Sequence, residues 1–191
     1  METKEHYYSD NEFFPTPYEL CLSALKTLPG DFEPELVLDP GAGEGIWGDA
    51  FRTLYSPYPD LYGLDIRSLD KPTEYDYWAV GDYLSDEFFD NQTYDLIMGN
   101  PPYSMAKEFV ERSVPLLNDA GYLVFLFRLA FLEGQDRGKN FWPNYIPKYV
   151  YVCSKRPSFT GDGRTDTKTA YSIIVWQKGF QGETTLRWLK W

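Results

Sequence analysis

The stretch Glu35-Leu-Val-Leu-Asp-Pro-Gly-Ala-Gly-Glu-Gly45 decides the fold that we predict for this chain. Its leucines and valine, ending in Asp39, are typical of a short buried strand. Three glycines at alternate positions then form a turn, and a helix through about Leu54 follows it. Small residues in such a turn let the backbone approach a ligand closely, and the start of the helix favours an anionic group. The pattern predicts a cofactor site that is not of the NAD type, whose glycines are spaced differently. A tight turn that binds no ligand is the alternative for this motif alone.

Strand and helix patterns alternate on both sides of this turn. Upstream, Thr16 can cap a helix that runs to about Leu28, with Pro17 in its first turn. Strands that alternate with helices predict a parallel sheet with helices on both faces. The predicted strands are 35–39, 61–65, 77–80, 94–98, 121–127, 148–153, 170–176 and 184–191. The helix that follows residue 103 is expected to have one apolar side formed by Phe109, Val110, Val114 and Leu117.

The composition limits the class of protein. Of the 191 residues, 43% are hydrophobic, which is enough for the core of one α/β domain, and the absence of a repeat or linker predicts a single domain over residues 1–191. The longest apolar run, 121–127, is shorter than the roughly 20 residues of a membrane-spanning helix, and no signal-peptide pattern precedes it, so we expect a soluble, cytoplasmic protein. Cys21 and Cys153 are not expected to pair, and the single histidine, His6, leaves no zinc site to predict.

The formal charge of −11 is the main argument against a polynucleotide substrate, because nucleic-acid-binding proteins usually carry a basic surface. The acidic excess is not uniform along the chain, however. In the polar segment 154–169 the basic residues outnumber the acidic ones, and we expect a local basic loop beside an acidic body. A solvated loop without a binding role is the alternative. The residues concerned are Lys155, Arg156, Arg164 and Lys168, against Asp162 and Asp166.

Two further carboxylates follow predicted strands. Asp65 ends the strand 61–65, about 20 residues after the glycine turn, where a carboxylate can accept hydrogen bonds from both hydroxyls of a ribose. Asp82 follows the strand 77–80 and can accept a hydrogen bond from an adenine amine. Either residue alone is also explained as an ordinary solvated strand end. Their occurrence at successive strand ends favours a ligand, since open α/β sheets bind ligands at the carboxyl edge.

The segment Asn100-Pro-Pro-Tyr103 comes one glycine after the strand 94–98. Its two prolines fix an extended turn and remove two N–H donors. The side-chain oxygen of Asn100 and the main-chain carbonyl of Pro101 can each accept a hydrogen bond from a substrate NH₂ group. The ring of Tyr103 offers a face for stacking on a planar base. The segment therefore predicts chemistry on an exocyclic amine.

Taken together, these motifs resemble those of the class I S-adenosylmethionine-dependent adenine-N6 DNA methyltransferases. The resemblance rests on Phe14-Pro-Thr-Pro17, Asp39-Pro-Gly-Ala-Gly-Glu-Gly45, Asp65, Gly81-Asp82 and Asn100-Pro-Pro-Tyr103, in the order found when the cofactor motifs precede the catalytic one. It implies a Rossmann-like fold with a mostly parallel twisted sheet, helices on both faces and an antiparallel strand near the carboxyl terminus. It also implies direct in-line methyl transfer to N6 of an adenine that is flipped out of the duplex.

The same resemblance implies roles for individual residues. Thr16 and Pro17 would hold the methionine end of the cofactor, and Asp39, Gly41 and Gly43 would hold its amino acid portion. Asp65 would hold its ribose, and Asp82 would hold its adenine. The catalytic segment would consist of Asn100, Pro101, Pro102 and Tyr103. The segment 156–159 resembles the family's eighth motif, in which Phe159 would hold the flipped base, unless its ring is ordinary core packing. Phosphates would be held by Lys155, Arg156, Arg164 and Lys168.

The chain departs from the family in one respect, since no sizeable target-recognition region is visible. Recognition would then come from short loops such as 132–140 and 154–169, from a specificity partner, or from a loosely specified target; the compact form is similar to small phage-encoded methyltransferases. Three other functions stay open: methylation of adenine in RNA, methylation of a glutamine amide in a translation release factor, and a non-catalytic role as an acidic binding module. A cytosine-N4 target is disfavoured, because those enzymes more often have serine in place of Asn100.

Overall fold

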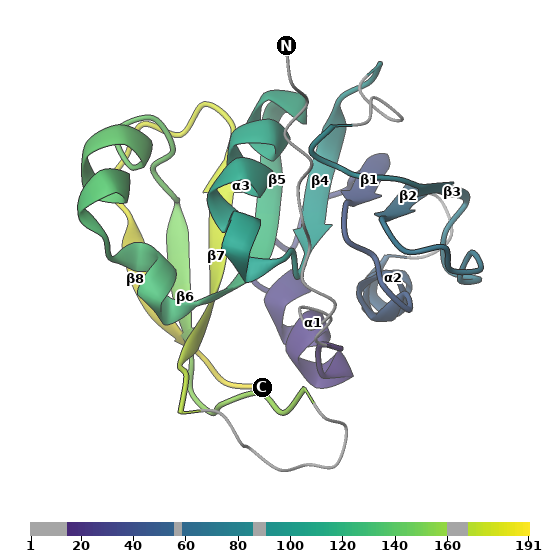
Figure 1. The fold of residues 1–191 in the computed structure, drawn as a ribbon, viewed down its shortest axis with the longest axis horizontal. Helices are drawn as coiled ribbons and strands as arrows, with labels where there is room; N and C mark the ends of the chain where they lie inside the picture. Colours follow the sequence, from purple (N-terminus) through teal and green to yellow (C-terminus); the bar gives the residue numbers. More distant parts are fainter. Residues whose placement is uncertain (1–14, 56–58, 86–90, 160–167) are drawn as a thin grey trace.

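The structure of the protein is a computed structural model that describes residues 15–55, 59–85, 91–159 and 168–191. One eight-stranded sheet, in the order β3-β2-β1-β4-β5-β7-β6-β8, runs through it (Figure 1). The strands are β1 (Leu36–Asp39), β2 (Asp60–Asp65), β3 (Tyr77–Val80), β4 (Tyr94–Gly99), β5 (Leu117–Arg128), β6 (Tyr149–Cys153), β7 (Tyr171–Gln177) and β8 (Thr185–Leu189). The α-helices are α1 (Tyr18–Leu25), α2 (Ile46–Leu54) and α3 (Ala106–Ser113), with short helical turns at η1 (Tyr103–Met105), η2 (Val114–Leu116), η3 (Leu129–Leu132) and η4 (Arg137–Phe141).

The strand directions confirm the predicted fold class. Strands β1 to β5 run parallel to one another, whereas β7 is antiparallel to both β5 and β6. The last strand, β8, pairs with β6 in parallel. The fold is a Rossmann-like α/β fold, with a mostly parallel sheet and an antiparallel strand near the carboxyl terminus.

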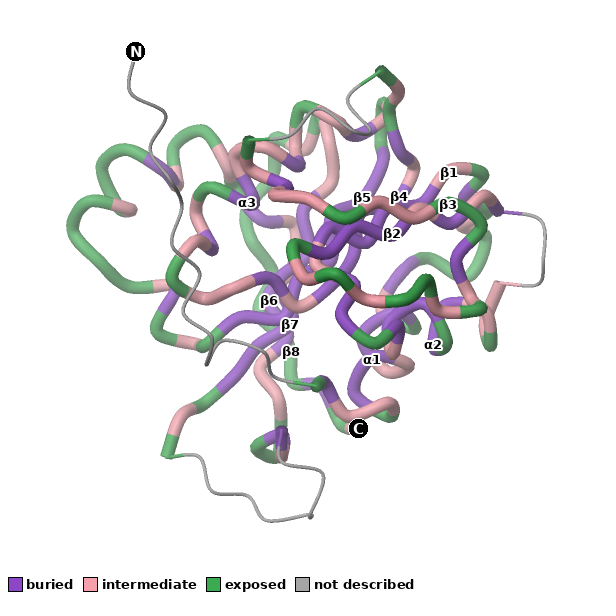
Figure 2. Tube along the Cα trace, turned by 45° about the vertical axis from the view of Figure 1, so that its right-hand side comes forward, coloured by how far each residue is buried: buried purple, intermediate pink, exposed green. Residues whose placement is uncertain are grey.

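Successive side chains along each strand lie on opposite faces of the sheet, so one hydrophobic core forms on each face. Val37 of β1 belongs to the cluster packed under α1 and α2, while its neighbour Leu38 belongs to the cluster under α3. The same alternation places Met98 on the first face and Ile97 on the second. Because consecutive strand residues point to opposite faces, a run of apolar residues is what a sheet covered on both sides requires. Figures 1 and 2 show α3 on one face, α1 and α2 on the other, and the buried central strands between them.

Two local predictions were wrong at helix ends. Thr16 does not cap α1; the helix begins at Tyr18 after Pro17, and the Thr16 hydroxyl instead accepts a hydrogen bond from the indole of Trp47 at 3.4 Å. Val114 and Leu117 do not lie on α3, which ends at Ser113. Pro115 lacks the N–H that a further helical turn needs, so Val114 falls in η2 and Leu117 begins β5.

The topology determines where a ligand can bind. The chain places β2 and β3 on one side of β1, and β4 and β5 on the other, so the order reverses between β1 and β4. In an open sheet the crevice beyond the strand ends at such a point is the usual ligand site. Asp39 ends β1, Asp65 ends β2 and Gly99 ends β4, so the predicted cofactor residues and the Asn100-Pro-Pro-Tyr103 segment meet at this edge.

In the part of the chain that the structure describes, no helix is long and apolar enough to cross a membrane. Within the same ranges, His, Cys, Asp and Glu residues form no group of three or more that could hold a metal ion. Cys21 is buried and Cys153 is half-buried, and both are free thiols.

Candidate functional site

Asp39 lies at the centre of the candidate site and is completely buried. Its Oδ2 atom accepts a hydrogen bond from the Tyr75 hydroxyl at 2.7 Å, whereas its Oδ1 atom is buried and accepts no well-formed hydrogen bond from the described residues. Burial raises the pKa of the Asp39 carboxyl from 3.8 to about 7, against the opposing effects of the hydrogen bond from Tyr75 and of the nearby backbone N–H of Gly41. A buried acceptor atom that lacks a hydrogen-bond donor is costly in a folded protein, so we expect Asp39 Oδ1 to accept a hydrogen bond from a ligand.

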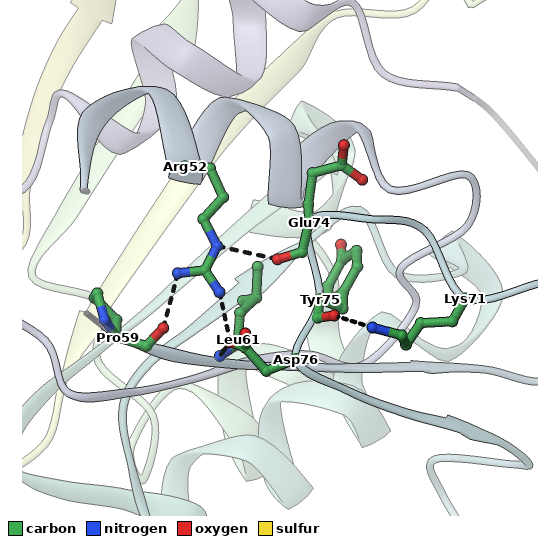
Figure 3. A network of polar contacts seen from close by, with 7 residues as sticks. All are labelled: Arg52, Pro59, Leu61, Lys71, Glu74, Tyr75 and Asp76. Atoms are coloured by element: carbon green, nitrogen blue, oxygen red, sulfur yellow. Dashed lines mark hydrogen bonds and ion pairs between the residues drawn. The ribbon is translucent and has the colours of Figure 1, made fainter. Parts of the chain in front are cut away.

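Tyr75 reaches Asp39 from the loop between β2 and β3, and polar contacts hold this loop against α2 (Figure 3). Arg52 of α2 donates hydrogen bonds to the carbonyls of Pro59 and Glu74, at 2.8 and 3.0 Å, and forms an ion pair with Asp76. Asp76 also accepts a hydrogen bond from the backbone N–H of Leu61 in β2. These contacts fix both ends of the loop segment that carries Tyr75.

The glycine turn is closed by Asp65. The backbone N–H of Gly43 donates a hydrogen bond to Asp65 Oδ2 at 2.8 Å, and Gly43 has a φ of +58°. Gly45 caps the start of α2 with a φ of +91°, and a Cβ there would lie 2.7 Å from the ring of Pro72. Both conformations favour glycine, so the turn depends on glycine for its shape as well as for close approach.

The Asp65 carboxylate is already engaged by its own chain. Besides Gly43, it accepts hydrogen bonds from the backbone N–H of Arg67 at 2.9 Å and from the Arg67 guanidinium at 2.9 and 3.3 Å. Asp65 is 6% exposed, and the Arg67 side chain is 36% exposed. A ribose that binds to this carboxylate must therefore displace the Arg67 side chain.

The glycine turn and the Asn100-Pro-Pro-Tyr103 segment are direct neighbours. A Cβ placed on Gly41 would lie 4.0 Å from the Cα of Pro101, and a Cβ on Gly99 would lie 2.9 Å from Asp39 Oδ1. Gly99 has a φ of +152°, outside the range that other residues prefer. The segment that could hold an amine thus lies directly beside the turn that could hold a cofactor.

Tyr103 lies at the edge of an aromatic cluster. Its ring centroid is 5.9 Å from that of Tyr171, which in turn lies 5.1 Å from Phe159 in an edge-to-face contact. The Arg128 guanidinium lies over the Tyr103 ring, 5.0 Å from the centroid. Burial raises the pKa of the Tyr103 hydroxyl far above its ordinary value, so the ring stays neutral. Arg128 and Tyr171 were not predicted from the sequence.

The other predicted residues lie around this centre or apart from it. Thr16 is buried against Trp47 at the start of α2, and Pro17 precedes α1. Asp82 follows β3, and its Oδ1 atom accepts a hydrogen bond from the N–H of Leu84 at 2.9 Å. Phe159 is 8% exposed and packs as part of the core, so its role in holding a base stays a prediction.

Of the four predicted phosphate-binding residues, three can be placed. Lys155, Arg156 and Lys168 are exposed, and Lys155 Nζ lies 4.2 Å from the centroid of the Trp191 ring. Arg164 lies outside the described residues, as does Phe14 of the amino-terminal motif. The structure therefore brings the residues that we predicted for the cofactor and for the amine to one edge of the sheet, and it places three of the predicted basic residues on exposed segments near that edge.

Two functional candidates could not have been read from local patterns. Tyr75 is 36 positions from Asp39, and no motif marks it. Arg128 ends a strand that the sequence predicts correctly, but its contact with Tyr103 depends on β4 and β5 lying side by side. The one available signal was its position, because a charged residue directly after an apolar strand in a parallel sheet lies at the ligand edge.

The residues present fit a nucleotide-type cofactor that carries an amino acid portion. Asp39 Oδ1 is a buried acceptor without a well-formed hydrogen bond from the described residues, which suits an ammonium group, and at Gly41 a side chain would point toward the nearby Cα of Pro101. Asp65 ends the second strand in the position of a ribose-binding carboxylate, and the Arg67 side chain occupies it in this structure.

Comparison with known proteins identifies the fold. No protein-family model matches the sequence, and no curated protein does. Among solved structures, a protein from Listeria monocytogenes described as a class I S-adenosylmethionine-dependent methyltransferase superposes with a TM-score of 0.68 at 16% identity, over 96% of this chain and 68% of its own. The type I restriction-modification methyltransferase subunit from Streptococcus thermophilus superposes with a TM-score of 0.71 at 15% identity, over 92% of this chain and 47% of its own.

A third similar structure is the N-methyltransferase NodS from Bradyrhizobium japonicum, with a TM-score of 0.56 at 14% identity, covering 84% of this chain and 94% of that protein. The present chain thus spans about two thirds of the first structure and about half of the second. At these identities the likeness is one of fold, and it agrees with the strand order and the position of β7.

Proposed function

We propose that the protein is an S-adenosylmethionine-dependent methyltransferase that transfers a methyl group to the N6 amine of adenine in DNA. One observation carries the proposal: the Asn100-Pro-Pro-Tyr103 segment lies directly beside the glycine turn, with Pro101 Cα 4.0 Å from the position of a Cβ on Gly41. An amine held by the Asn100-Pro-Pro-Tyr103 segment would therefore lie next to a cofactor held by the glycine turn. Proximity of this kind is the main source of rate in a direct transfer reaction.

The cofactor residues are those that surround the space in front of the glycine turn. Asp39 would accept a hydrogen bond from the ammonium group, Asp65 from the ribose and Asp82 from the adenine amine. Thr16 and Pro17 would border the methionine end, beside the start of α2. When bound, S-adenosylmethionine supplies an electrophilic methyl group on a sulfonium, whose thioether is a good leaving group.

The protein's own part in the reaction is to hold and polarise the amine. The Asn100 side-chain oxygen and the Pro101 carbonyl would each accept one N–H of the adenine amine, which directs the nitrogen lone pair toward the methyl group. The two carbonyl oxygens would stabilise the positive charge that develops on the nitrogen as it accepts the methyl group, until a proton leaves the nitrogen to water. Pro102 stiffens the turn, and Tyr103 provides the ring surface beside the base.

DNA is the proposed substrate because the motif order is that of the adenine-N6 DNA enzymes, and because a similar structure is a restriction-modification methyltransferase subunit. Since the described residues contain no large recognition region, we propose that short loops or a specificity partner select the target. RNA adenine and a protein glutamine amide present a similar planar NH₂ group, and they are the alternatives that an experiment must separate.

The test is a substrate panel with labelled S-adenosylmethionine. Duplex DNA, single-stranded DNA, RNA and a release factor are incubated with the wild-type protein and with Asn100→Ala. We expect label in DNA with the wild type only, while calorimetry gives the two proteins cofactor affinities within a few-fold of each other. Label in the release factor or in RNA alone would overturn the DNA substrate. Failure of the wild type to bind the cofactor would favour the non-catalytic binding module.

A further inference from the structure

Charge is divided sharply along the chain. Residues 1–147 contain ten Lys and Arg against 26 Asp and Glu, a net charge of −16, whereas residues 148–191 contain eight against three, a net charge of +5. The second part forms β6, β7 and β8, which lie together at one side of the sheet (Figure 1). The total of −11 therefore averages over an acidic body and a basic carboxyl-terminal unit.

Strand pairing brings the ends of this unit to the edge that carries the candidate site. Arg128, the last residue of β5, pairs with Tyr171, the first residue of β7. Val152 of β6 pairs with Ser172, and Cys153 pairs with Leu189 of β8. The ends of β5, β6 and β8 and the start of β7 therefore lie in one row. Five exposed basic residues lie at or next to these strand ends and are here called the basic edge: Arg128, Lys168, Lys155, Arg156 and Lys190.

Within the described residues, no carboxylate forms an ion pair with a cation of the basic edge. Across the described ranges, the salt bridges are Arg52–Asp76, Arg67–Asp65 and Lys107–Glu111, all within the acidic part of the chain. Two cations of the basic edge lie over aromatic rings instead: Arg128 over Tyr103 at 5.0 Å, and Lys155 over Trp191 at 4.2 Å. An aromatic face orients a cation without cancelling its charge, so these residues remain available to an anion.

The same edge changes sign at the catalytic segment. On the β1, β2 and β3 side it carries Asp39, Asp65 and Asp82, and on the β5 to β8 side it carries the basic edge. A polyanion that places one residue at Asn100 would be repelled from the first side and attracted to the second. The opposite charges on the two sides would therefore orient a bound polyanion along β5 to β8 as well as attract it.

We infer that the basic edge is a track for one polynucleotide strand, which runs from the catalytic segment past Arg128 and on to Lys155 and Lys190. The inference rests on the proposed function and assigns the strand its path; Arg128, Lys190 and Trp191 are new to the site. With strands ~4.8 Å apart, the row from β4 to β8 spans roughly 19 Å. That length corresponds to between about five and six steps at the ~3.4 Å axial spacing of phosphates along one strand of a DNA duplex. A single row of cations, one or two at each strand end, fits one phosphate backbone.

The experiment measures how salt weakens binding of a fluorescent single-stranded oligonucleotide that contains adenine. Each phosphate contact contributes about 0.7 to the slope of log affinity against log salt for a single strand. With five contacts, wild-type affinity should fall roughly 100-fold between 50 and 200 mM salt, and with three contacts roughly 20-fold. The test variant is Lys155→Gln/Lys190→Gln, and the matched control is Lys26→Gln/Lys139→Gln, which removes two exposed cations outside the basic edge.

We expect the slope to fall by about 1.4 in the test variant and to stay at the wild-type value in the control. Arg128→Gln should lower the slope by about 0.7 and also raise the KM for the oligonucleotide, with cofactor affinity unchanged. Equal slopes in the wild type and the test variant, in a protein that methylates the oligonucleotide, overturn the track and leave the proposed function intact. A wild type that binds no polynucleotide at 50 mM salt overturns both.

Discussion

Cofactor affinity should depend on pH through Asp39. In the unliganded protein, burial raises the pKa of the Asp39 carboxyl to about 7, so roughly half of the molecules carry a proton there at pH 7. An ammonium group placed at the unpartnered Oδ1 atom favours the charged carboxylate and lowers this pKa in the complex. Binding at pH 7 should therefore release about half a proton per site.

The size of the effect follows from the protonated fraction. With a pKa of about 7, protonation of the Asp39 carboxylate weakens the apparent affinity roughly 30-fold at pH 5.5 and by less than about 1.5-fold at pH 7.5. Affinity for S-adenosylmethionine should thus tighten roughly 25-fold over this range, which corresponds to about 1.9 kcal/mol.

Isothermal titration calorimetry in buffers of different ionisation enthalpy measures both the affinity and the released protons. Asp39→Asn is the control, since it keeps the shape of the side chain and removes the titrating group; its affinity should be weak and independent of pH. If the wild type binds with the same affinity at pH 5.5 and 7.5, Asp39 does not face the ammonium group, and this part of the site is wrong.

Four further outcomes are expected. The folded-state pKa of Asp39 is raised above its ordinary 3.8, so the contribution of Asp39 to the free energy of unfolding is present at low pH and is lost as the pH rises through about 7. Denaturant unfolding without cofactor should show this loss as a change of roughly 4 kcal/mol. Tyr75→Phe removes the hydrogen bond to Asp39, which should cost roughly 1.5–3 kcal/mol of stability near neutral pH and move the pH dependence of cofactor binding upward. Gly99→Ala places a Cβ 2.9 Å from Asp39 Oδ1 and should weaken cofactor binding roughly tenfold or more without preventing folding, as calorimetry and a thermal melt can show; unchanged affinity would contradict the close approach. Arg67→Gln removes the guanidinium that pairs with Asp65, which we propose binds the ribose, and should tighten cofactor binding by up to about fivefold, because a partly exposed pair is worth about 0–1 kcal/mol.

The sequence predicted the backbone of this protein well because the signals for it are local. The apolar run before Asp39 and the glycine turn that follows it mark β1 and the start of α2, and the carboxylate at Asp65 marks the end of β2. Each of the eight predicted strands is present. The edge at which these residues meet then follows from the general behaviour of parallel sheets.

The side-chain contacts within the site could not be predicted in the same way. Thr16 has the sequence context of a helix cap, but its hydroxyl binds Trp47, 31 positions away, because tertiary packing competes with local capping. Tyr75 and Arg128 act on residues that are distant in the sequence, and only the folded sheet brings them together. The −11 charge was misleading for a related reason, since it sums over surfaces that strand pairing separates.

The most direct test of the account identifies the atom that receives the methyl group. A DNA oligonucleotide with one adenine is incubated with the protein and methyl-labelled S-adenosylmethionine, digested to nucleosides and analysed by mass spectrometry. The account predicts the label in N6-methyldeoxyadenosine with the wild type and its absence with Asn100→Ala. Label on another base, or equal N6 methylation by both proteins, would contradict the role of the Asn100-Pro-Pro-Tyr103 segment as the amine-binding site.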